Sequence, residues 1–150
     1  MALEAPLKNT VYVIGEFNNW TPTSTFQMKK DGDVFWLEIS GLTPGQEYAF
    51  QYLVDESIVV GDPYADKILD PNNDLFIPES TYPSLKSYPE GANGIVSVLQ
   101  TNQTPYDWQI TDFERPASEE LVIYELLVRD FEEGQNYESV IDRLDYPISL

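Results

Sequence analysis

The sequence predicts a mainly β protein: an antiparallel β-sandwich followed by the first strand and helix of a parallel α/β structure. Short apolar segments separated by turn residues fill residues 11–100, which is typical of an antiparallel sandwich. A run at 121–128 is apolar almost throughout and shows no in–out alternation, which favours a strand buried on both faces. Residues 137–144 then place apolar side chains at helical spacing.

The first half of the chain contains the patterns of several sandwich strands. Within residues 34–39 and 48–54, alternate side chains are apolar or aromatic, so one face of each strand should be buried. Turn residues precede these strands, because glycine accepts a positive φ and proline presets φ in a turn. Residues 58–60 should pair back on 48–54 as a hairpin. We therefore expect strands at 11–14, 34–39, 48–54 and 58–60.

The stretch from residue 61 to residue 94 is rich in proline, which cannot join the middle of a sheet. We expect an ordered excursion there, with one short strand around 75–77, and a last sandwich strand at 95–99. Residues 101–116 contain several aromatic side chains and should be a packed connection between the two parts. The expected division is residues 1–103 for the sandwich, 104–118 for the connection and 119–150 for the strand–helix unit.

The strand–helix unit has its own local signals. Asn136 can cap a helix, Glu138 suits the first turn, and Pro147 should stop the helical pattern. A carboxylate in a strand buried on both faces needs a partner, so we expect Glu125 to pair with Arg129 in a structural role. One such unit cannot bury both of its apolar faces, which predicts the opening of a larger domain.

Composition excludes several classes of function. The formal charge of -18, from 26 acidic and 8 basic residues, disfavours nucleic acid and anionic membrane surfaces as partners. The sequence has no cysteine and no histidine, which removes disulfides, thiolate zinc sites and Ser–His–Asp catalysis. We expect no cofactor. The location stays open, and export to the periplasm or the extracellular space is compatible with the composition.

One acidic stretch has part of the spacing of a calcium loop. Asp70, Asn72 and Asp74 alternate as the first three ligands would, but Leu75 and Thr81 stand where a glycine and a bidentate acid are needed. A proline turn is the better interpretation, and we expect no metal site.

The stretch VYVIGEFNNW at 11–20 has the chemistry of a sugar-binding surface. An indole can stack on a pyranose face, while the amides of Asn18 and Asn19 can bond hydroxyl groups. Trp20 could equally cap the sandwich core, and the residues alone leave both alternatives open.

Two groups of motifs carry a family resemblance. The runs VYVIGEFNNW, LTPGQEY, FQYLVD and GDPYA resemble the glycogen- and starch-binding domains of carbohydrate-binding module family 48. The run LVIYELLVRDF followed by NYESVIDRLDY resembles the first strand and helix of the catalytic barrel in the alpha-amylase family of glycoside hydrolases, family 13. The resemblance implies an immunoglobulin-like (early-set) antiparallel β-sandwich followed by one βα unit of a truncated (β/α)8 barrel.

The resemblance also implies site residues. Trp20, beside Asn19, falls on the tryptophan that stacks against glucose, and Gln51 falls where glycogen-binding members have a lysine. A second tryptophan is expected just before the Asp-Pro pair, but residues 58–61 contain no aromatic. The catalytic acids of the alpha-amylase family lie on later barrel strands, and no acid here matches them. We therefore assign no catalytic residue.

The expected function is the N-terminal region of an alpha-amylase-type glycoside hydrolase acting on α-glucans such as starch or glycogen. The resemblance implies a retaining, two-carboxylate mechanism for the parent enzyme. The fragment itself would be a non-catalytic packing or accessory domain. The alternatives are a freestanding α-glucan-binding module and a structural surface domain that binds no sugar. Expected partners are an α-glucan, the remaining barrel, or a second copy through Leu121–Val128, since unpaired strands invite pairing.

Overall fold

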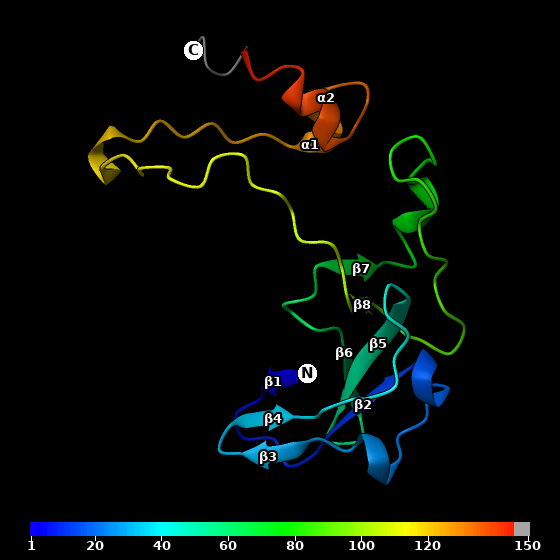
Figure 1. The fold of residues 1–150 in the computed structure, drawn as a ribbon. Coiled ribbons are helices and arrows are strands. Elements are labelled where there is room, and N and C mark those ends of the chain that lie inside the picture. Colours follow the sequence, from blue (N-terminus) through cyan, green and yellow to red (C-terminus); the bar gives the residue numbers. More distant parts are fainter. Residues whose placement is uncertain (146–150) are drawn as a thin grey trace. The chain divides into compact units, whose positions relative to one another are not determined.

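The structure is a computed structural model that describes residues 1–145 of the 150-residue chain (Figure 1). Two compact units are present. The first comprises Met1–Phe76 and Lys86–Thr104, and the second comprises Ile77–Leu85 and the chain from Pro105 onwards.

The first unit is built from two antiparallel sheets. The small sheet has the order β1-β4-β3, with β1 at Ala2–Glu4, β3 at Lys29–Asp31 and β4 at Val34–Trp36. The large sheet has the order β2-β5-β8-β7, with β6 also paired to β5. Its strands are β2 Val11–Gly15, β5 Glu47–Val54, β6 Ile58–Val60, β7 Lys67–Leu69 and β8 Val96–Gln100. Short 3-10 helices lie at Glu16–Asn18 (η1), Ser24–Phe26 (η2) and Asp74–Phe76 (η3).

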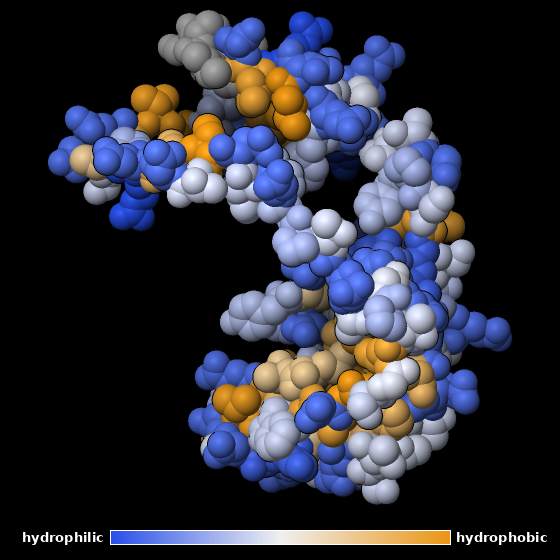
Figure 2. Space-filling view, in the orientation of Figure 1, coloured by the Kyte–Doolittle hydropathy of each residue, from blue (hydrophilic) through white to orange (hydrophobic). Residues whose placement is uncertain are grey.

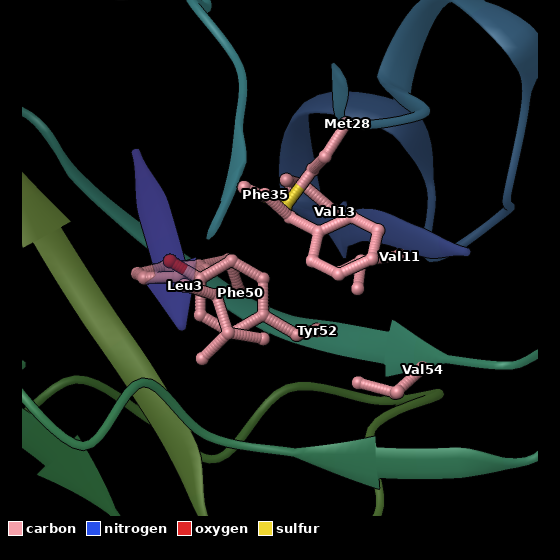
Figure 3. Close-up of a cluster of buried hydrophobic side chains, with 8 residues drawn as sticks. All are labelled: Leu3, Val11, Val13, Met28, Phe35, Phe50, Tyr52 and Val54. Carbon is pink, nitrogen blue, oxygen red and sulfur yellow. The ribbon is translucent and has the colours of Figure 1, made fainter. Parts of the chain in front are cut away.

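The core lies between the two sheets. Val11 and Val13 of β2 stand opposite Val54 and Tyr52 of β5 in the antiparallel register, so these four side chains share one face. Figure 3 shows this face together with side chains from the small sheet and the segment before it. The buried cluster consists of Leu3, Val11, Val13, Met28, Phe35, Phe50, Tyr52 and Val54. The chain is thus mainly β, with the two antiparallel layers expected of an immunoglobulin-like sandwich.

Strand β5 is buried on both faces. Phe50, Tyr52 and Val54 point to the core cluster, while Ala49 and Gln51 are also buried on the opposite face. The Gln51 amide reaches the backbone carbonyl groups of Asn93 and Ile95, so the chain before β8 lies over this second face. The central strand of the sheet is therefore covered on both sides.

Most of the strands expected from the sequence are confirmed. Leu37 and Ile39 pack against the core with Phe35, as their alternation predicts, although β4 is regular only to Trp36. The β5–β6 hairpin turns at Asp55 and Glu56, which both adopt positive φ. The confirmed segments correspond to β2, β4, β5, β6 and β8.

The proline-rich stretch was predicted incorrectly. Its strand is β7 at Lys67–Leu69, which pairs with β8, and not residues 75–77. Leu75 and Phe76 belong to η3 and are 84% and 81% exposed. Apolar residues alone did not mark the strand, because an edge strand of three residues needs only one buried side chain, here Leu69. Strands β1 and β3 were not predicted.

The second unit contains η4 at Ser118–Glu120, α1 at Val128–Phe131 and α2 at Tyr137–Ile141. The strand expected at 121–128 is wrong in this structure: the backbone has no ladder partner among the described residues, and Val122 is 93% exposed. A strand needs a neighbour for its N–H and C=O groups, and none is present in residues 1–145. Figure 2 shows hydrophobic residues at the surface of this unit, and the exposed ones include Val122, Ile123 and Ile141.

Of the local predictions in this unit, the helix cap is confirmed and the ion pair is wrong. The Asn136 cap is confirmed, because its side chain accepts a hydrogen bond from the Ser139 amide at 2.9 Å. The expected pair of Glu125 with Arg129 is wrong: Glu125 is exposed, and Arg129 pairs with Asp130 at 2.8 Å. Pro147 lies outside the described residues.

The connection after the sandwich exposes several aromatic side chains. Tyr106, Trp108 and Phe113 are between 71% and 75% exposed, and the two first rings contact each other edge to face. Within residues 1–145, no helix has the length and apolar character needed to cross a membrane.

Candidate functional site

The turn after β2 determines where Trp20 lies. The Asn18 side chain accepts a hydrogen bond from the Gly15 amide at 2.9 Å and donates one to the Val13 carbonyl at 2.8 Å. The oxygen and the nitrogen of the Asn18 side-chain amide therefore both bond the backbone of β2. Asn18, which the sequence offered as a sugar contact, instead holds the turn closed.

Asn19 and Trp20 adopt consecutive left-handed backbone conformations, with φ of 52° and 58°. Asparagine tolerates this region, but a bulky residue such as tryptophan rarely adopts it. Two backbone hydrogen bonds hold the turn: the Trp20 amide donates to the Gly15 carbonyl at 2.9 Å, and the Thr21 amide donates to the Asn18 backbone carbonyl at 3.1 Å. As a result, Asn19 is exposed and Trp20 is half-buried.

A surface hollow of about 460 Å³ lies beside Trp20. Gly91 packs against the indole, since a Cβ on this glycine would lie 3.5 Å from Trp20 Cδ1, and its φ of +90° suits glycine alone. The hollow is lined by Glu16, Asn19, Trp20, Pro89, Glu90 and Gly91. Sequence reasoning missed the segment at 89–91, although its Pro-Glu-Gly composition is a turn signal.

The carboxylate of Glu16 is already engaged. One oxygen accepts a hydrogen bond from the Ala49 amide at 2.9 Å, and the other pairs with Lys86 Nζ at 3.0 Å. These contacts fix the acid at the edge of the hollow. The arrangement thus offers an indole, an exposed amide and the exposed carboxylate of Glu90, which suits a neutral polyhydroxyl ligand better than an anion.

Gln51 is not part of this hollow. Its side chain is 1% exposed, and its Nε2 donates to the carbonyl groups of Asn93 at 2.6 Å and Ile95 at 2.8 Å. Its Oε1 accepts from the Asn93 amide at 3.5 Å. The structure therefore brings Trp20 and Asn19 together but places Gln51 in a buried structural role, without access to a ligand.

The calcium-like spacing forms a turn, as the sequence indicates. The Asp70 carboxylate accepts hydrogen bonds from the Asn73 side chain and the Asn72 amide. These bonds, of which the one from Asn73 has the larger effect, lower the pKa of Asp70 below its ordinary value. Asp74 in turn accepts from the Asp70 amide at 2.9 Å. Within the described part of the chain, no cluster of acidic residues could hold a metal ion.

Comparison with known proteins gives a family match for part of the first unit. Residues 5–65 match the family model of carbohydrate-binding module 48, described as the isoamylase N-terminal domain. This part of the first unit is therefore similar in sequence to the carbohydrate-binding modules of family 48. The resemblance seen in VYVIGEFNNW and the motifs after it is confirmed for this segment, which includes the Trp20 turn and most of the large sheet.

A curated relative extends the similarity beyond the module. The malto-oligosyltrehalose trehalohydrolase of Saccharolobus solfataricus is 29% identical to this chain over 130 residues. The alignment covers 87% of this chain and 21% of the relative, so the chain spans about a fifth of that protein's length.

Proposed function

We propose that this chain is the N-terminal, non-catalytic region of an alpha-amylase-type glycoside hydrolase that acts on α-glucans. The observation that carries the proposal is the 130-residue similarity to a malto-oligosyltrehalose trehalohydrolase, which reaches well beyond the module at residues 5–65. The resemblance of LVIYELLVRDF to the first barrel strand of that enzyme family supports it. In this role the module is an accessory or packing domain.

The chemistry of the hollow supports a non-catalytic role. A retaining glycosidase needs two carboxyl groups about 5–5.5 Å apart, one free to exchange a proton and one free to attack. Glu16 bonds the Ala49 amide and pairs with Lys86, so its carboxylate is held in a structural contact. This acid is poorly suited to either catalytic task.

The test is an activity assay of residues 1–150 on starch. We expect no release of reducing sugar above that of a heat-denatured sample. Sustained release that scales with protein concentration would overturn the non-catalytic role, whatever the fold.

A second candidate function is direct α-glucan binding through Trp20, as in a freestanding module. The half-buried indole beside an open hollow favours it. Calorimetric titration with maltoheptaose distinguishes the cases: lost affinity in Trp20→Ala, with affinity kept in the ring-preserving Trp20→Phe, supports binding. No heat with millimolar sugar supports a structural domain that binds no sugar.

We also propose that the chain self-associates through Leu121–Val128. This run exposes apolar side chains and unpaired backbone groups, which can pair with a second copy. Sedimentation should show concentration-dependent dimers that Val122→Pro removes, because proline lacks the N–H needed for pairing. A monomer at all concentrations would contradict this.

A further inference from the structure

A second hollow in the first unit, separate from the one at Trp20, has the features of a ligand site. Its volume is about 350 Å³, within the range of small-molecule pockets, and it shares no lining residue with the Trp20 hollow. Phe50 and Leu99 contribute apolar surface to its wall, while Tyr64 and Asp66 contribute an aromatic ring and a carboxylate.

Tyr64 is held on a rigid support although its ring is in solvent. The side chain is 87% exposed, but its amide donates to Asp62 Oδ1 at 2.9 Å. Asp62 is in turn tied to the core: Tyr52 donates its hydroxyl to Oδ2 at 3.0 Å, and the Asp62 amide donates to Ser97 Oγ at 2.6 Å. Because Tyr52 and Ser97 are fully buried, the loop that carries Tyr64 is anchored to the sandwich.

The polar groups beside the ring are free to bind. Among the described residues, the exposed carboxylate of Asp66 has no hydrogen bond and no salt bridge, in contrast to Asp62, which is fully engaged. A carboxylate accepts hydrogen bonds from hydroxyl groups, and an exposed tyrosine ring can stack on the apolar face of a pyranose.

The charge of the chain narrows the choice of ligand. With a net charge of -18, an acidic partner would be repelled from a hollow that contains Asp62 and Asp66. A neutral polyhydroxyl ligand avoids this repulsion and can use the free carboxylate of Asp66. An aromatic ring, an apolar wall and an unpaired acceptor together match the requirements of a sugar.

We propose that the Tyr64 hollow is a second α-glucan-binding surface, with Tyr64 as the stacking platform and Asp66 as a hydroxyl acceptor. The identity of the sugar rests on the proposed function of the chain. The site follows the Asp-Pro pair at 62–63, whereas the aromatic expected from the family resemblance would precede it and is missing.

The test is an NMR titration of the whole 150-residue chain with maltotriose. Amide shifts at Tyr64, Ala65 and Asp66 should saturate, and Tyr64→Ala should weaken this binding roughly fivefold or more. Tyr64→Phe should retain it, because the ring remains. Trp20→Ala and Tyr106→Ala, a variant at a tyrosine that is 73% exposed outside the hollow, should leave it unchanged.

Two results would overturn the proposal: no saturable shift at residues 64–66, or a Tyr64→Ala variant with wild-type affinity. In the second case the hollow is open to a protein contact instead. Analysis of the maltotriose recovered after the titration distinguishes a failure of this inference from a failure of the proposed function. Cleaved maltotriose would contradict the non-catalytic role. Intact sugar without binding at Tyr64 would overturn this inference and leave the non-catalytic role standing.

Discussion

Replacing Asn18 by alanine should destabilise the sandwich by about 2–3 kcal/mol. The side chain makes two partly buried hydrogen bonds, from the Gly15 amide at 2.9 Å and to the Val13 carbonyl at 2.8 Å. Each such bond contributes about 0.5–1.5 kcal/mol net, and leaving a buried partner unpaired adds to the loss. Val13 and Gly15 are both buried, so water cannot easily replace the lost amide.

The assay is urea denaturation followed by far-ultraviolet circular dichroism, with the m-value compared between variants to verify that both unfold from a similar native state. Thr25→Ala is the matched control. Thr25 is exposed in η2 and its side chain has no hydrogen bond within residues 1–145, so its loss should change stability by less than about 0.5 kcal/mol. A loss in Asn18→Ala no larger than in the control would refute the role of this side chain in holding the Trp20 turn.

Three further predictions concern buried and anchored polar groups. Gln51→Leu should lower the free energy of unfolding by about 2–3 kcal/mol in urea, because the buried amide pairs two backbone carbonyl groups; an unchanged midpoint would contradict this. Burial, with the Asp62 carboxylate adding to it, raises the pKa of Tyr52, so the folded chain holds this proton more tightly than the unfolded chain. The free energy of unfolding should therefore fall as the pH rises above about 10, and it should fall less in Tyr52→Phe. The same dependence on pH in both proteins would contradict this prediction. Hydrogen bonds from the Asn9 and Thr10 amides lower the pKa of Asp55. The contribution of this carboxylate to the stability of the fold should therefore be present above about pH 4 and be lost as the pH falls through the lowered pKa. Asp55→Asn should reduce this acid sensitivity in thermal melts, and the same dependence in both proteins would count against the assignment.

The strands of the sandwich could be predicted where aromatic or large apolar side chains alternate with other side chains along the sequence. Residues 48–54 alternate aromatic and smaller side chains, and they form the central strand β5. The hairpin to β6 followed from a short polar turn between two apolar runs. The Trp20 turn was recognised as a candidate site, but its geometry was not, because the two bonds of Asn18 to β2 depend on contacts that no residue pattern displays.

The failures arise where structure depends on partners distant in the sequence. Leu121–Val128 has the composition of a buried strand, but a strand exists only beside another strand, and the described residues supply none. Gln51 was a candidate because it falls where glycogen-binding members of family 48 have a lysine. It is buried because the segment that contains Asn93, more than forty residues later, lies over the second face of β5.

The most direct test of the whole account is one titration of residues 1–150 with maltoheptaose, in which heat is recorded and the recovered sugar is then separated by length. The account predicts saturable heat, because the Trp20 and Tyr64 hollows are proposed to bind α-glucan, and sugar recovered intact, because the chain is proposed to be non-catalytic. Shorter products would contradict the non-catalytic role, and no heat with sugar in the millimolar range would contradict both proposed binding surfaces.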